Sequence, residues 1–272
     1  MLKAIPIALA ASVLAACTSG SPVLRYGLPD PVRATYTASD TVVITVDALG
    51  QSLELAVRSS ATYGATFSGA PERVRVTLGI EALSAEVSVP MAEPIRMDES
   101  LVSGELVFAL DPAGDVDVMS SPDVTETGGE FFSGVALAHS LFPGLPGREA
   151  KVGDSWVDTV SFEMGSGEAV SSQHDVLEYT VRGEVRRDGR SLVEIGFAGT
   201  SEGSQTLSFG VMQVRQTTEL QVDGTLFWDP ARGLVRERTM RAVGTGSVRV
   251  PIAPVALATK VESSSRVRLD DR

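Results

Sequence analysis

The sequence predicts an all-β, or at least β-dominated, fold in which long antiparallel strands form a curved sheet or an open barrel. Three observations lead to this prediction. Apolar and polar residues alternate with a period of two along much of the chain, which is typical of strands with one buried face. Turn-forming residues separate these runs at short intervals, and no helix-period segments lie between them. Only residues 129–142 show apolar residues at helical spacing.

The alternation predicts strands from residue 33 onward. The apolar residues that carry it are Leu53, Leu55, Val57; Val74, Val76, Leu78, Ile80; Leu106, Phe108, Leu110; Leu177, Tyr179, Val181, Val185; Val193, Ile195, Phe197; Leu207, Phe209, Val211; Leu220, Val222; Val248 and Val250.

The turns between these runs have hairpin chemistry. Asp188-Gly189 is a pair that tolerates positive φ in a two-residue turn. Asp111-Pro112-Ala113-Gly114 and Asp229-Pro230-Ala231-Arg232-Gly233 place proline where φ must be fixed and glycine where it must be free. The turns therefore favour antiparallel pairing.

Residues 129–142 are predicted to form a helix. Proline after Phe142 blocks its continuation, and Gly134 weakens it by about 1 kcal/mol relative to alanine. The apolar stripe consists of Phe131, Phe132, Val135, Ala138 and Phe142. This helix and the Pro/Gly-rich connector that follows it, together residues 129–150, are predicted to join two β-rich halves, residues 33–128 and 151–272.

The two halves share a short internal similarity. Gly104-Glu-Leu-Val-Phe precedes Asp111-Pro112, and Gly224-Thr-Leu-Phe-Trp precedes Asp229-Pro230. Either the β unit is duplicated, or hairpins have used the same turn residues twice. The sequence leaves both explanations open.

The N-terminus is predicted to be an export signal. Lys3 precedes an apolar run that is too short to span a bilayer and extends to Ala16. Leu14-Ala15-Ala16-Cys17 resembles the lipobox of bacterial lipoproteins, which implies that residues 1–16 are removed and Cys17 is acylated. Cys17 is the only cysteine, although an ordinary secretory signal with a chance cysteine is the alternative.

The resemblance also implies a location. Thr18 is not the aspartate that is associated with retention in the inner membrane, so we expect an outer-membrane anchor facing the periplasm. Acyl groups on Cys17 would be the contact with the membrane. Residues 17–32 are rich in Gly, Ser and Pro and are predicted to be a flexible tether.

Charge and motifs exclude several function classes. The net charge of −12 makes nucleic-acid binding improbable, because such a surface repels phosphates. Gly199-Thr-Ser201-Glu-Gly203 matches the nucleophile-elbow pattern, but the residues after it alternate like a strand. His139 and His174 are the only histidines, and we expect neither to be catalytic. We therefore predict that the protein is not an enzyme and has no metal or other cofactor.

The predicted architecture resembles that of the LolA, LolB and LppX-like lipoproteins and carriers, in which a tethered open barrel has helical elements over its concave face. Locally, Phe142-Pro143-x-Leu145-Pro146 and Lys151-Val-Gly-Asp-Ser-Trp156 resemble a phrase found in exported bacterial proteins. The resemblance covers residues 33–269 and rests on architecture.

Two functions remain open at this point. In the first, the protein is a noncatalytic cell-envelope lipoprotein that binds an apolar or amphipathic, lipid-like ligand in the concavity of the sheet, lined by Phe131, Phe132, Val135 and Phe142. In the second, it is a structural or accessory interaction module of an envelope protein assembly, with a packed interior and an exposed patch or strand edge.

Overall fold

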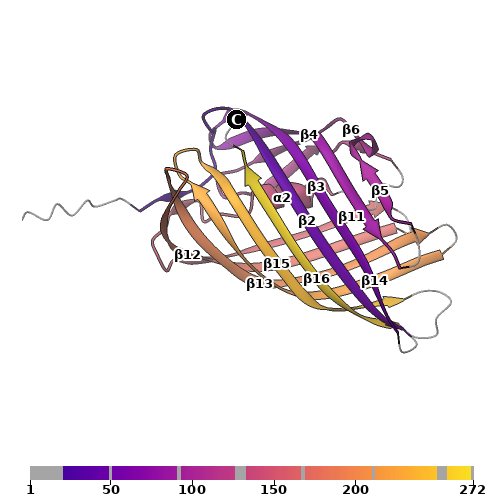
Figure 1. Ribbon diagram of the computed structural model, residues 1–272. Coiled ribbons are helices and arrows are strands. Elements are labelled where there is room, and N and C mark those ends of the chain that lie inside the picture. Colours follow the sequence, from indigo (N-terminus) through magenta and orange to yellow (C-terminus); the bar gives the residue numbers. More distant parts are fainter. Residues whose placement is uncertain are drawn as a thin grey trace, which may run out of the picture.

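The computed structural model describes residues 21–48, 51–90, 93–125, 133–166, 169–209, 212–249 and 256–270. Its main feature is a twelve-stranded antiparallel sheet that is curved but not closed, which confirms the predicted all-β fold class (Figure 1). The strands of this sheet are β2 (Arg33–Ala48), β3 (Gln51–Ala70), β4 (Arg73–Ser88), β5 (Ile95–Asp98), β7 (Glu105–Leu110), β8 (Val116–Ser120), β11 (Ser155–Ser166), β12 (Ala169–Arg187), β13 (Arg190–Phe209), β14 (Met212–Asp229), β15 (Leu234–Arg249) and β16 (Leu257–Leu269).

The other described elements are short. A 3-10 helix, η1, spans Glu99–Leu101, and the α-helix α2 spans Gly134–Leu141. The two small antiparallel sheets are β1 (Val23–Leu24) with β10 (Arg148–Glu149), and β6 (Val102–Ser103) with β9 (Asp123–Val124).

The strand order keeps each half of the chain together. The order is β11-β12-β13-β14-β15-β16-β2-β3-β4-β7-β8, with β5 also pairing with β4. The halves therefore meet where β16 pairs with β2, from Thr259 opposite Val46 to Leu269 opposite Tyr36. Helix α2 contacts β8 and β11, the two ends of this order, and the sheet wraps around it in Figure 1.

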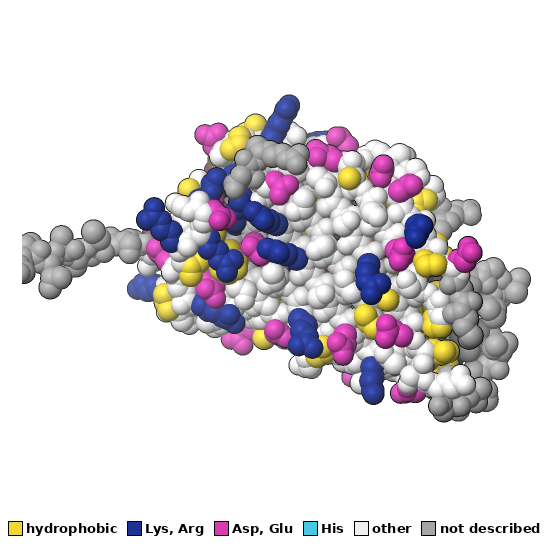
Figure 2. Space-filling model, in the orientation of Figure 1, with side chains coloured by type: hydrophobic (Ala, Val, Ile, Leu, Met, Phe, Trp, Pro, Cys, Tyr) yellow, Lys and Arg dark blue, Asp and Glu magenta, His cyan; other side chains and the backbone are white. Residues whose placement is uncertain are grey.

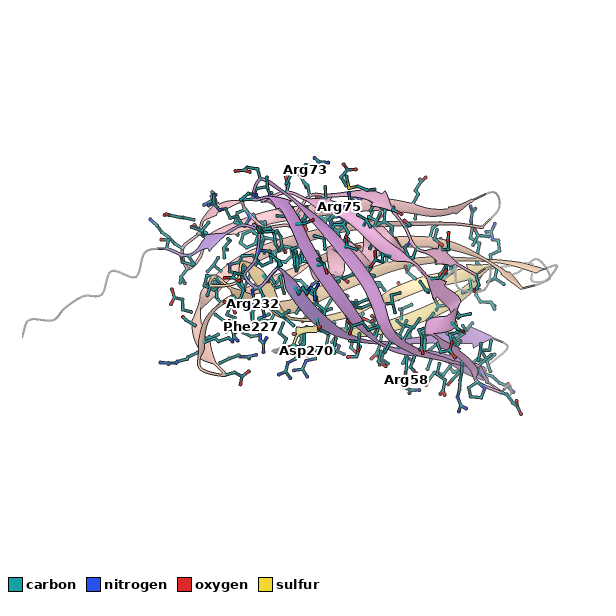
Figure 3. The ribbon with its side chains drawn as sticks, turned by 90° about the horizontal axis from the view of Figure 1, so that it is seen from above. Arg58, Arg73, Arg75, Phe227, Arg232 and Asp270 are labelled. Carbon is teal, nitrogen blue, oxygen red and sulfur yellow. The ribbon has the colours of Figure 1, made fainter. Side chains whose placement is uncertain are left out.

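The alternation in sequence decides which face of each strand is buried. In β3, for example, Ala61, Tyr63, Ala65 and Phe67 face the interior, and the residues between them are less buried. Arg58, from the same strand, points outward in Figure 3. β-Bulges shift this alternation in several strands, among them β12 at Val181/Gly183 and the β14–β15 pair at Phe227/Trp228.

An aromatic cluster fills one end of the barrel-like sheet. Phe142, immediately after α2, is fully buried at its centre and makes ring contacts at centroid distances of 5.7 to 6.1 Å. Its ring partners are Tyr26, Tyr36, Phe67 and Phe108. Trp228 extends the cluster through Tyr26, at 5.3 Å. This end of the sheet is therefore a packed core.

Part of the predicted flexible tether belongs to that core. Within the segment 17–32, β1 pairs with β10, and both Leu24 and Tyr26 are buried, so this part of the segment packs against the rest of the protein. The Tyr26 hydroxyl donates a hydrogen bond to the Pro143 carbonyl at 2.9 Å. Two large apolar side chains in a Gly/Pro/Ser-rich segment are enough to hold it against the core.

The helix is shorter than predicted. Ser133 is its N-cap and accepts a hydrogen bond from the Ala136 amide, and the helix ends at Leu141, before Phe142-Pro143. Gly134 lies close to Leu106 of β7, where a larger residue would not fit without a shift. Residues 129–132 of the predicted helix lie outside the described residues. Within the described ranges, no helix has the length and apolar content needed to cross a membrane.

The outer face of the sheet is polar. Figure 2 shows charged side chains toward both ends of this face, a largely uncharged middle, and only scattered apolar side chains. Hydroxyl residues such as Thr37, Ser39 and Thr41 of β2 occupy outward positions. The large apolar surfaces of the strands therefore face inward.

Candidate ligand cavity

The concave face of the sheet encloses a cavity of about 860 Å³ beyond the aromatic cluster. Strands β2 to β5 and β14 to β16 supply most of its apolar lining. The apolar lining residues are Val42, Ile44, Leu55, Val57, Val87, Val89, Ile95, Met97, Leu177, Leu220, Val222, Met240, Ala242 and Val261. This volume lies within the range of small-molecule sites in proteins.

The rest of the wall is polar. It comes mainly from β12 to β14, with Arg238 from β15 and Ser263 from β16. The polar side chains from β12 to β14 are Gln173, Asp175, Ser201, Gln205, Gln216 and Thr218. Strands β2 to β5 contribute only apolar lining residues, and the polar ones all come from β12 to β16. Because one side of the wall is wholly apolar and the other carries polar groups, the cavity is suited to an amphipathic molecule.

A second cavity of about 610 Å³ adjoins the first. Val57, Met97 and Gln173 are among the residues that line both, so the two hollows share a wall. Helix α2 contributes to this second cavity with Ala136, Leu137 and Ser140, and its N-cap Ser133 also lines it. The space between α2 and the sheet is therefore partly open, not filled by side chains.

Exposed apolar residues mark the mouth of the larger cavity. Val89 and Ile95 line it, yet they are 38% and 52% exposed. They lie on either side of the connection from β4 to β5, at the end of the sheet away from the aromatic cluster. An apolar ligand entering there would cover apolar surface that now contacts water.

The four residues predicted to line the ligand cavity do not share one location in the structure. Phe142 is buried in the aromatic cluster, and the linings of the two cavities do not include it. Val135 is partly buried on α2 and is likewise not in either lining. Phe131, Phe132 and Cys17 lie outside the described residues. The helix faces the second cavity through Ala136, Leu137 and Ser140 instead.

The apolar lining was partly visible in the sequence. Leu55, Val57, Leu177, Leu220 and Val222 belong to the alternating runs, and their strand positions give them inward faces. Alternation alone does not show which inward residues pack against others and which face a hollow. That distinction depends on the curvature of the sheet.

Two titratable side chains lie near the buried end of the cavity. Burial raises the pKa of Tyr179 to about 12, so its hydroxyl is neutral at physiological pH. Burial lowers the pKa of His139 below its usual 6.5; Asp158, Asp115 and Asp175 oppose this shift, and Arg238 adds to it. The Nδ1 atom of His139 is buried and has no hydrogen-bond partner among the described residues.

We expect His139 to make the fold sensitive to acid. Its folded-state pKa is lower than its unfolded value, so the unfolded chain binds the proton first as the pH falls below about 6.5. Stability should therefore fall between pH 7.5 and pH 5.0, and His139→Gln should lose less over this interval. Urea unfolding at both pH values measures the difference. His174→Gln, at an exposed position, should behave like the wild type; an unchanged loss in His139→Gln would contradict the assignment.

The other motif residues do not form a catalytic arrangement in the described part of the chain. Ser201 lies in the middle of β13, so its Gly-x-Ser-x-Gly motif lacks the strand-turn-helix context of a nucleophile elbow. Exposed His174 contacts the Ser161 hydroxyl on neighbouring β11, at 2.7 Å. Over the described ranges, His, Cys, Asp and Glu residues do not gather in groups of three or more that could hold a metal ion.

Comparisons with known proteins do not place the chain in a family. No family model matches it, and no curated protein matches it. Among solved structures, DynF from the dynemicin biosynthesis pathway of Micromonospora chersina is 10% identical, with 91% of this chain and 85% of that chain covered and a TM-score of 0.24. A DUF1329 family protein from Desulfovibrio piger is 11% identical, with 87% and 86% covered and a TM-score of 0.15.

A third solved structure, OpdQ of Pseudomonas aeruginosa, is 6% identical, with 88% of this chain and 97% of that chain covered and a TM-score of 0.20. Likenesses at these TM-scores carry no functional argument.

Proposed function

We propose that this protein is a noncatalytic envelope lipoprotein that binds a lipid-like, amphipathic ligand inside its curved sheet. The cavity of about 860 Å³ is the observation that carries the proposal: β2 to β5 form a wholly apolar side of its wall, the polar groups come from β12 to β16, and its mouth is apolar. Acylated Cys17 would hold the protein on the periplasmic side of the outer membrane.

The alternative, an interaction module, has less support. A protein that only presents loops or strand edges to an assembly needs no internal hollow, and hollows lower stability because their walls lose packing contacts. Adjoining cavities of about 860 and 610 Å³ therefore favour a ligand over a purely structural role.

A direct test is to identify what the protein carries. The protein should be purified from cell envelopes without detergent exchange and extracted with organic solvent. Mass spectrometry should then detect a lipid-like molecule at a near-stoichiometric ratio to the protein. Extracts that contain no more lipid than those of an unrelated lipoprotein would contradict the proposal.

Blocking the cavity should abolish binding. Val57 lies in the wall that the two cavities share, so Val57→Trp would put an indole into the ligand space. We expect the affinity for the neutral fluorescent probe N-phenyl-1-naphthylamine to fall at least tenfold. Arg58→Trp is the matched control, because Arg58 is the next residue of β3, is exposed and points outward (Figure 3). Equal probe binding by both variants would contradict this location.

A further inference from the structure

Among the described residues, the lining of the larger cavity includes one cationic side chain, that of Arg238. In the register of the sheet, Arg238 of β15 lies between Leu226 of β14 and Val267 of β16, which are 0% and 3% exposed. An arginine at such an apolar position loses much of the water that would stabilise its charge. The groups that contact the Arg238 guanidinium therefore indicate whether its role is structural or ligand binding.

The contacts of Arg238 are with neutral groups. Nη1 donates a long hydrogen bond of 3.4 Å to the Ser140 carbonyl in the last turn of α2, and Nη2 lies 3.7 Å from the sulfur of Met240. The guanidinium carbon lies 5.1 Å from the ring centre of Phe197, and the guanidinium also interacts electrostatically with Tyr179. Nε is buried and has no hydrogen-bond partner among the described residues.

The carboxylates near Arg238 accept hydrogen bonds from other groups. Asp175 lines the same cavity, but its two oxygens accept hydrogen bonds of 3.0 and 2.8 Å from the Gln173 amide. Asp158 accepts a hydrogen bond of 2.9 Å from the Gly144 amide. The ion pairs in the described part of the chain do not include Arg238. Its positive charge thus faces the cavity without a carboxylate in contact.

We propose that Arg238 binds the anionic head group, a carboxylate or phosphate, of the amphipathic ligand. This inference rests on the proposed function, since it concerns the same cavity. A guanidinium presents a planar fork of donors that matches the oxygens of either group. The apolar chain would extend along Val222, Ala242 and Val261 toward the mouth at Val89 and Ile95.

The carboxylates of the lining restrict the charge of the head group. Asp175 lines the larger cavity and Asp40 the adjoining one, so a head group with several negative charges would be repelled. A single negative charge satisfies Arg238 with the least repulsion. The Ser201 hydroxyl can donate a hydrogen bond to a head-group oxygen that Arg238 does not reach.

The test compares ligands that differ only in the head group. Delipidated protein is loaded with N-phenyl-1-naphthylamine, and dodecanoate, dodecyl phosphate or dodecanol is added as competitor. We expect the wild type to prefer dodecanoate over dodecanol by about tenfold. Dodecyl phosphate carries nearly two negative charges at pH 7, so its preference over dodecanol should be smaller. Arg238→Met keeps an apolar side chain of similar length and should reduce this preference to near one, with each competitor measured relative to the variant's own affinity for the probe. Arg58→Met, on the outer face, should keep the preference.

The outcomes separate the two proposals. If the wild type does not bind the neutral probe, the proposed function fails. If it binds the probe but shows no preference for the anionic competitors, or if Arg238→Met keeps that preference, Arg238 only supports the end of α2 and the inference is overturned. If inorganic phosphate displaces the probe as effectively as dodecyl phosphate does, the alkyl chain contributes nothing to binding, and the proposal of an amphipathic ligand is overturned. If Arg238→Met does not fold, Arg238→Gln replaces it in the same experiment. The preference of the wild type for anionic competitors is measured without either variant.

Discussion

Phe142→Ala should lower the free energy of unfolding by about 4 kcal/mol, in the range found for truncation of buried aromatic residues. Phe142 is fully buried and contacts the rings of Tyr26, Tyr36, Phe67 and Phe108. Those partners come from the N-terminal segment and from β2, β3 and β7, so the cavity left by truncation cannot collapse by moving one element alone. The loss should be near the upper part of the range for this reason.

Chemical denaturation followed by tryptophan fluorescence measures this change, because Trp228 lies in the same cluster. Phe142→Leu is the conservative control and should lose much less, since it keeps most of the buried volume. Val152→Ala, at a position that is 69% exposed, should leave stability nearly unchanged. A loss below about 1 kcal/mol in Phe142→Ala would show that the cluster is not a cooperative part of the core.

The position of Phe142 also explains why the sequence could not locate the cavity. A phenylalanine next to a helix on a concave sheet is equally consistent with core packing and with a cavity wall. The backbone around Phe142 decides between them: Leu145 donates a hydrogen bond to the Ala113 carbonyl at 2.7 Å, and Trp156 donates one to the Gly144 carbonyl at 3.0 Å. These hydrogen bonds hold the connector in place, so that the Phe142 side chain points into the packed end of the sheet.

The fold class was predictable because alternation is a local signal. Residues such as Val74, Val76 and Leu78 are inward and buried, as their spacing indicates. The pairing of β16 with β2 was not predictable, because it joins residues that are more than 200 positions apart and has no local signature. The order of the strands, and with it the location of the cavity, follows from such long-range pairings.

Arg238 shows a second limit of sequence patterns. Val235 is buried opposite Trp228, and unbroken alternation from it would turn Glu237 and Thr239 inward. The bulge at Arg236 shifts the strand by one residue, so that Arg238 and Met240 face the cavity instead. A one-residue shift exchanges the two faces of a strand, and bulges are poorly marked in a single sequence.

Neighbouring strands approach closely at two glycines of the curved sheet, and we expect the curvature that creates the cavity to depend on them. A Cβ atom at Gly199 of β13 would overlap the carbonyl oxygen of Val176 in β12. A Cβ atom at Gly244 of β15 would overlap the carbonyl oxygen of Glu219 in β14. In each case the neighbouring atom belongs to the backbone, so it cannot move away as a side chain would. Glycine within a strand often marks such a tight bend.

Gly199→Ala and Gly244→Ala should therefore each lower the free energy of unfolding by about 3 kcal/mol, at the upper end of the usual cost of overpacking. Gly27→Ala is the matched control, because a Cβ atom there would meet nothing within 4 Å. Urea denaturation measures the stabilities, and the neutral probe reports on the cavity in the folded fraction. If the strands separate locally to admit the methyl group, the sheet flattens and probe affinity falls together with stability. Variants as stable as Gly27→Ala would contradict the link between these glycines and the curvature, because a sheet that accepts a Cβ atom at both positions does not need glycine there to enclose the cavity.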